Sequence, residues 1–252
     1  MPDLTYRLVI RVCHGLFRLL GLRIDVVGAH RLPATGPVLV AANHSSFIDF
    51  MFVGLVGTRG RLVRFMAKQS VFDAPVSGQL LRGMRHIPVD RAHGVTAARS
   101  ALRALRAGEV VGIYPEATIG RAFVVKDRAD LKRGAAYLAL ATGAPIVPVA
   151  HWGIHRIYTV DGRLSLRRGR AVQVLVGDPI SPLPGEDAEA LTSRLHGVLA
   201  GLVEQLVSTY PQKPVTPHTA WWWPASHGGA APPPEEARIL DEQARLRADA
   251  RP

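Results

Sequence analysis

Two kinds of hydrophobic pattern alternate along the chain. Short runs rich in Val, Ile and Leu recur, and the segments between them carry apolar residues at helical spacing. Such runs predict β-strands, and helical spacing bounded by Gly, Pro, Ser or Asp predicts helices. The predicted strands are residues 23–27, 37–42, 62–67, 86–89, 110–114, 146–150 and 171–176. The clearest predicted helices are residues 47–56, 76–83, 94–106, 132–142 and 186–209. This alternation indicates an α/β fold with helices on the faces of a sheet.

Residues 4–22 form an apolar segment interrupted by basic side chains. Arg7, Arg11, His14 and Arg18 are spaced by four, three and four positions, so they share one face of a helix. Its apolar stretches are too short for a spanning helix, and it lacks the clean apolar core of a secretory signal. We interpret residues 1–22 as an amphipathic helix in the membrane interface, with its arginines toward the headgroups. The alternative is a soluble helix that packs on the domain.

Composition divides the rest of the chain in two. Residues 23–210 hold all the predicted strands and form the predicted domain, whereas residues 211–252 are rich in Pro and Gly. This tail is predicted to contain one short helix at residues 235–249. It also carries three adjacent tryptophans at 221–223. These indoles fit either a membrane interface or a cap folded back on the domain.

Charge and cysteine content narrow the classes of protein. The chain has 252 residues, 48% hydrophobic and 20% charged, which excludes a mainly disordered protein. Its single cysteine, Cys13, can form neither an intramolecular disulfide nor a thiolate cluster, which favours a reducing location. The net charge is +11, and residues 1–110 hold 15 Lys and Arg against 6 Asp and Glu. Nucleic acid, an anionic membrane or phosphorylated ligands would each suit this charge.

The candidate chemistry begins where the second predicted strand ends. His44 and Asp49 follow that strand directly, at a strand-to-helix turn of the kind that often carries reactive groups. A histidine base needs a carboxylate that fixes its tautomer and stabilises its positive form. Five residues do not align two side chains on a helix, but a turn can bring them together. In the alternative interpretation, Asn43, Ser45 or Ser46 caps the helix and His44 is merely exposed.

Four segments follow one another in a fixed order. They are NHSSFID at 43–49, GMRHIPVDR at 83–91, YPEATIGR at 114–121 and APIVPVA at 144–150. In this order they resemble the four sequence blocks of the glycerolipid acyltransferase family, which includes the 1-acylglycerol-3-phosphate acyltransferases. The resemblance implies a mixed sheet with helices on its faces, preceded by the amphipathic helix.

The resemblance also implies roles for individual residues. His44 corresponds to the general base and Asp49 to its partner carboxylate. Arg91 corresponds to an arginine associated with the acceptor's phosphate, and Pro148 to a proline that shapes the acyl-binding side. The implied substrate-binding residues are Gly83, Arg91, Glu116, Thr118, Arg121 and Pro148. No metal site is implied.

The third block departs from the family's usual Pro-Glu-Gly-Thr-Arg at two positions. Ala117 replaces the glycine, and Ile119 replaces the arginine. Arginine holds phosphate through two charge-assisted hydrogen bonds, and isoleucine offers none. Either Arg121, Lys126 or Lys132 makes that contact instead, or the acceptor is not plain lysophosphatidic acid.

The function implied is acyl transfer at a membrane. The enzyme would move a fatty acyl group from acyl-CoA or acyl carrier protein to the hydroxyl of a lysophospholipid in phospholipid synthesis. The resemblance favours 1-acylglycerol-3-phosphate as this acceptor. No covalent enzyme intermediate is needed, because the thioester is already activated, and we expect no cofactor. We expect a peripheral or monotopic protein on the cytoplasmic face of the cell membrane, at an anionic surface. The alternatives are a different lyso-lipid or glycolipid acceptor, and a non-catalytic basic membrane-binding protein.

Other classes fit the sequence less well. A serine hydrolase would need a G-x-S-x-G elbow, which does not occur. A metal hydrolase would need closely spaced ligands, and His86, His93, His151 and His155 show no such pattern. A nucleic-acid-binding protein would suit the charge, but the chain has no recognised module and only 6% aromatic residues for base stacking.

Overall fold

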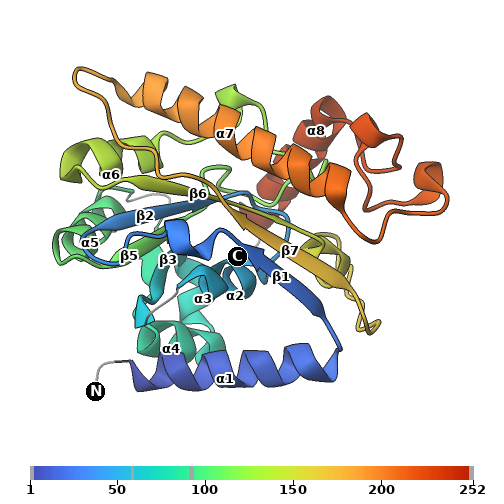
Figure 1. The fold of residues 1–252 in the computed structure, drawn as a ribbon, viewed down its shortest axis with the longest axis horizontal. Coiled ribbons are helices and arrows are strands. Elements are labelled where there is room, and N and C mark those ends of the chain that lie inside the picture. The colour runs from blue at the N-terminus through green and yellow to red at the C-terminus, as the bar shows by residue number, and fades with distance from the viewer. Residues whose placement is uncertain (1–2, 58–59, 91–93, 250–252) are drawn as a thin grey trace.

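The computed structural model describes residues 3–57, 60–90 and 94–249, and a seven-stranded sheet forms its centre (Figure 1). The strands are β1 (Arg23–Val27), β2 (Val38–Ala42), β3 (Val63–Lys68), β4 (Ile87–Val89), β5 (Val110–Ile113), β6 (Ile146–Trp152) and β7 (Ala171–Val176). Their order across the sheet is β1-β7-β6-β2-β5-β3-β4. Only the β6–β7 pair among these neighbours is antiparallel, so the sheet is mixed, as expected.

Helices cover both faces of this sheet. They are α1 (Leu4–Leu19), α2 (Asp49–Val53), α3 (Gln69–Asp73), α4 (Pro75–Gly83), α5 (Gly94–Arg106), α6 (Gly134–Thr142), α7 (Ala188–Thr209) and α8 (Pro234–Asp249). Apolar side chains of α5, α6 and α7 share one core cluster, and those of α1 and α2 share another. Strand β2 serves both clusters, because alternate side chains along a strand point to opposite faces. Val38 and Val40 thus face α2, whereas Leu39 and Ala41 face α6.

Helix α1 presents two different apolar stripes. Its buried side chains anchor it to the domain: the Tyr6 hydroxyl donates to the Val63 carbonyl at 2.9 Å, and Phe17 stacks on Phe52. The helix therefore packs on the domain. A second stripe is exposed and consists of Leu4, Leu8, Val12, Leu16 and Leu19. Within the ranges that the structure describes, no helix is both long and apolar enough to cross a membrane.

The segment after α7 returns to the domain and packs on it. Trp223 is buried, with its ring centroid 6.2 Å from that of Trp152, and its indole N–H donates to the His227 carbonyl at 3.1 Å. The Trp222 carbonyl lies 3.0 Å from Nε2 of buried His155. Of the two interpretations of the tryptophans, the structure shows the cap. The chain then continues into α8, which lies behind the end of α7 in Figure 1.

Candidate active site

A tight turn joins β2 to α2 and brings His44 and Asp49 together. Asp49 is the first residue of α2, and its Oδ2 accepts the backbone N–H groups of Ser45 at 2.8 Å and Ser46 at 2.9 Å. The same oxygen lies 3.0 Å from Nδ1 of His44. Asp49 thus closes the turn and contacts the imidazole with one atom. The turn therefore brings together two side chains, His44 and Asp49, that are five positions apart in the sequence.

The electrostatics of the pair suit a base. The Asp49 side chain is only 1% exposed, and burial alone would raise its pKa. The charges of His151 and His44, and their hydrogen bonds, outweigh burial and hold the pKa of Asp49 well below its usual range. An ionised Asp49 keeps the His44 proton on Nδ1, which leaves Nε2 with a lone pair. The His44 side chain is 19% exposed, so this face of the site is open.

A second histidine, His151, contacts the same carboxylate. Its Nε2 lies 3.4 Å from Asp49 Oδ2 and 2.6 Å from the Asn43 carbonyl oxygen. The Asn43 side chain bonds the backbone of His151 in both directions, at 2.9 and 3.2 Å. Burial would lower the pKa of His151, but the Asp49 carboxylate raises it. Sequence reasoning considered His151 only as a metal ligand. The missed signal is its position in β6, which points a polar side chain to the same face as Val147 and Val149.

Side chains from the segment after β5 hold His44 from the other side. Glu116 Oε1 accepts the backbone N–H of His44 at 2.8 Å, and the Gly120 N–H donates to the His44 carbonyl at 3.1 Å. The Tyr114 ring stacks on the imidazole, with the centroids 4.3 Å apart. Burial raises the pKa of Glu116 to about 7, against the opposing effects of the His44 and Lys126 contacts. Glu116 therefore holds the backbone of His44 in place.

Two cations, Lys126 and Arg121, belong to the same segment as Glu116. The backbone N–H of Lys126 donates to Glu116 Oε2 at 3.2 Å, and Lys126 Nζ donates to the Thr118 hydroxyl at 2.6 Å. Arg121 forms two hydrogen bonds with Asp161, at 2.7 and 3.2 Å. Asp241 of α8 contacts both Arg121 and Lys126. Lys126 thus contacts Glu116 and Thr118, and Asp241 links it to Arg121.

Two of the other predicted binding residues, Gly83 and Pro148, occupy packed positions away from His44. Gly83 ends α4 beside α1, where an added Cβ would lie 2.8 Å from Cγ2 of Thr5, so this glycine allows two helices to approach closely. Pro148 alternates with His151 in β6 and so faces the opposite side of the sheet, where it is buried near Leu202 of α7. Arg91 lies outside the described residues.

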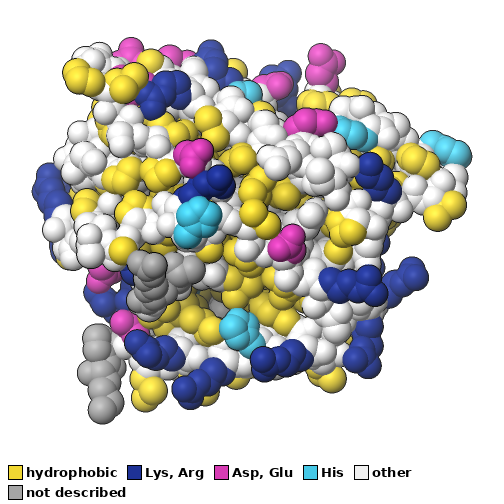
Figure 2. Space-filling view, in the orientation of Figure 1, with side chains coloured by type: hydrophobic (Ala, Val, Ile, Leu, Met, Phe, Trp, Pro, Cys, Tyr) yellow, Lys and Arg dark blue, Asp and Glu magenta, His cyan; other side chains and the backbone are white. Residues whose placement is uncertain are grey.

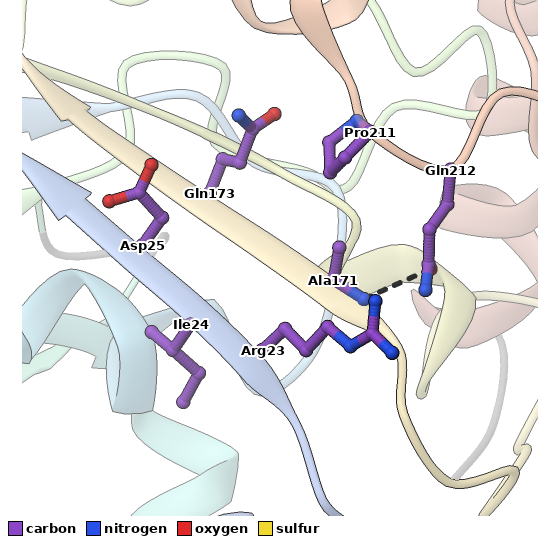
Figure 3. A pocket seen from close by; sticks show the side chains of 7 residues that line it. All are labelled: Arg23, Ile24, Asp25, Ala171, Gln173, Pro211 and Gln212. Atoms are coloured by element: carbon purple, nitrogen blue, oxygen red, sulfur yellow. Dashed lines mark hydrogen bonds between the residues drawn. The ribbon is translucent and has the colours of Figure 1, made fainter.

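A pocket of about 220 Å³ lies elsewhere in the fold. It spans β1 and β7 and the start of the segment after α7 (Figure 3). The side chain of Gln212 there accepts the Ala171 N–H at 3.0 Å. In the sheet, β6 lies between β7 and β2, the strand that His44 follows, and none of the predicted site residues lines this pocket. Among the residues that the structure describes, no group of three or more His, Cys, Asp and Glu could hold a metal ion.

Comparisons with known proteins identify related acyltransferases. The chain is 29% identical over 183 residues to a 1-acyl-sn-glycerol-3-phosphate acyltransferase of Bacillus subtilis, covering 68% of this chain and 86% of that one. It is 32% identical over 183 residues to the human 1-acyl-sn-glycerol-3-phosphate acyltransferase beta, covering 70% of this chain and 63% of that one.

The fold has a counterpart among solved structures. The crystal structure of PlsC from Thermotoga maritima, a 1-acyl-sn-glycerophosphate acyltransferase, superposes with a TM-score of 0.68 at 22% identity, covering 82% of this chain and 81% of that one. The sequence model of the acyltransferase family matches residues 23–152, which is more than half of this chain and runs from β1 through β6. The chain therefore belongs to the acyltransferase family.

Proposed function

We propose that this acyltransferase moves a fatty acyl group from acyl-CoA, or from acyl carrier protein, to the hydroxyl of 1-acylglycerol-3-phosphate in phospholipid synthesis. The observation that carries the proposal is the His44–Asp49 contact of 3.0 Å, which leaves Nε2 of a partly exposed imidazole able to accept a proton. The names of the Bacillus and human relatives support this acceptor.

The proposed chemistry uses His44 twice. Nε2 takes the proton of the acceptor hydroxyl as its oxygen attacks the thioester carbonyl. The tetrahedral intermediate then collapses and expels the thiolate, which takes the proton from Nε2. Asp49 remains ionised throughout and stabilises the imidazolium. The enzyme forms no covalent bond with the acyl group. The proton that leaves the acceptor hydroxyl passes through His44 Nε2 to the thiolate, so His44 accounts for the whole proton transfer.

We further propose that α1 holds the enzyme on a membrane surface at the cytoplasmic face. The exposed stripe of α1 would enter the interface, and Arg7, Arg11 and Arg18 on the same helix would contact anionic headgroups. Lys and Arg side chains form a row along this lower edge of the molecule in Figure 2, where α1 lies in Figure 1. Figure 2 also shows hydrophobic side chains at the surface between α1 and the sheet, close to this edge.

A different lyso-lipid or glycolipid acceptor is the second candidate, and one observation favours it. Ile119 stands where the family usually has an arginine, and it is buried. Arg121 and Lys126, which could replace that arginine, are both paired with carboxylates. An acceptor without a phosphate would need neither cation.

The test is an acyl-transfer assay with a panel of acceptors. Purified protein receives acyl-CoA or acyl carrier protein and either 1-acylglycerol-3-phosphate, other lysophospholipids or lyso-glycolipids, while free thiol and lipid product are measured. We expect product with the phosphate acceptor, and a loss of roughly 10²-fold or more in His44→Ala. His30→Ala, which changes an exposed histidine, serves as the matched control. Full activity in His44→Ala, or no acceptor-dependent thiol release, would refute the proposal.

A further inference from the structure

Asp241 bridges the two cations of the candidate site. Its Oδ1 lies 2.6 Å from Nη1 of Arg121, and its Oδ2 lies 3.0 Å from Nζ of Lys126. The three side chains are only 9%, 12% and 16% exposed, in the order Asp241, Arg121 and Lys126. Each carboxylate oxygen thus serves one cation, which is the way two oxygens of a phosphate group would bind.

Two carboxylates already form ion pairs with these two cations. Arg121 and Lys126 supply two positive charges, and Asp161 and Asp241 supply two negative ones. A phosphate monoester carries between one and two negative charges near neutral pH. It would have to displace Asp241 from the cations or lie beside a like charge, and either course costs binding free energy.

Glu116 links the backbone of Lys126 to the backbone of the proposed base. One of its carboxylate oxygens accepts the backbone N–H of His44, and the other accepts the backbone N–H of Lys126. The chain segments that carry the proposed base and one of the two cations are therefore held together by a single side chain. In 1-acylglycerol-3-phosphate the reacting hydroxyl and the phosphate lie on neighbouring carbons.

We propose that Asp241 is a specificity-determining residue, whose carboxylate competes with the acceptor's phosphate for Arg121 and Lys126. The inference rests on the proposed function, which it deepens. Acceptors without a phosphate do not compete with Asp241, so this residue reduces the advantage of phosphate-bearing acceptors over neutral ones. It comes from α8, beyond the 23–152 segment that defines the family.

The first experiment compares Asp241→Asn with the wild type on two acceptors. The substitution keeps the side-chain size and removes the charge. We expect the KM for 1-acylglycerol-3-phosphate to fall about fivefold or more, while the KM for a monoacylglycerol stays the same. Glu236→Gln, the same loss of charge at an exposed position of α8, should leave both values unchanged. If α8 instead detaches from the domain in this variant, Arg121 and Lys126 also lose their contact with residue 241. The KM for 1-acylglycerol-3-phosphate should then fall as well.

Three outcomes would overturn the inference. They are an unchanged KM for the phosphate acceptor, an equal fall for both acceptors, and a fall confined to the KM for acyl-CoA, which would assign the cations to the donor's phosphates. The gain should also disappear when Lys126→Gln is added to Asp241→Asn.

A binding measurement separates this inference from the proposed function. Glycerol 3-phosphate is titrated into the full-length protein by calorimetry, with no acyl donor present. Tighter binding to Asp241→Asn than to the wild type supports the competition even if no acceptor is acylated, a result that would refute only the proposed function. Equal binding would refute the competition whatever the acyl-transfer assay shows.

Discussion

The carboxylate of Glu116 accepts a hydrogen bond from the backbone N–H of His44, with 2.8 Å between Oε1 and nitrogen. A buried acid therefore fixes the backbone of the proposed base, whereas the sequence blocks implied a substrate contact for this residue. The contact joins the segment after β5 to the turn after β2, two neighbouring parallel strands. Substitutions at Glu116 should therefore affect the geometry of His44 more directly than they affect acceptor binding.

The raised pKa of Glu116 should make the stability of the protein depend on pH. Its pKa is raised from 4.5 to about 7 in the folded protein, so the folded state retains a proton that the unfolded state releases. Stability should therefore fall as pH rises between about 4.5 and 7, by roughly 3 kcal/mol from this group. In Glu116→Gln this contribution disappears. Urea unfolding at several pH values tests this, and parallel curves for the two proteins would contradict it.

His151 should act as a positioning residue for Asp49 and Asn43. His151→Ala removes the 2.6 Å contact with the Asn43 carbonyl and the charge beside Asp49, so we expect kcat to fall about tenfold. His151→Gln can still donate to that carbonyl and should recover most of the loss. The KM for the acceptor should stay constant in both variants. A change confined to KM, or no rescue by glutamine, would argue against positioning.

Ala117 stands at the position where the family usually has glycine, and it should lower the free energy of unfolding relative to glycine. Its φ of 58° lies in the left-handed region, and its side chain is exposed and so contributes little packing. Ala117→Gly should raise the free energy of unfolding by about 1 kcal/mol, because glycine adopts this conformation without strain. Ala107→Gly is the control, since Ala107 is exposed but has no positive φ. An equal effect of the two substitutions would contradict the strain.

The exposed stripe of α1 should control membrane binding. Leu8→Glu with Val12→Glu places charges on the stripe without touching the buried anchors Tyr6 and Phe17. We expect binding to anionic vesicles to fall at least about tenfold with unchanged thermal stability. Leu164→Glu with Leu166→Glu makes the same change at exposed leucines elsewhere. Vesicle sedimentation decides, and equal binding by both double variants would contradict the assignment. Deleting the helix would be a poorer test, because it would uncover the core.

Much of the fold could be predicted because its signals are local. Each strand is a short apolar run between turn residues, and each predicted run lies on an observed strand. Helix α3 was missed because its five residues, Gln69–Asp73, are too few to show a helical period. Gly83 and Pro148 lie at closely packed positions, and membership in a sequence block does not distinguish packing from binding.

The site was predictable only where it is continuous in the sequence. His44 and Asp49 fall within one turn, so their spacing carried the prediction. His151 and Asp241 reach the site through tertiary contacts with Asn43 and Arg121, more than one hundred positions away. No periodicity or spacing records such contacts, because they depend on how β6 and α8 are placed.

The pairing of β1 with β7 bears on how the chain is made. Arg23 pairs with Ala171, so β1, at the edge of the described sheet, pairs with a strand near the other end of the domain. During synthesis, α1 and β1 leave the ribosome long before β7 exists. The exposed stripe of α1 is therefore available to a lipid surface while most of the domain is still untranslated. Under the membrane contact proposed for α1, this helix would reach the bilayer before the sheet is complete.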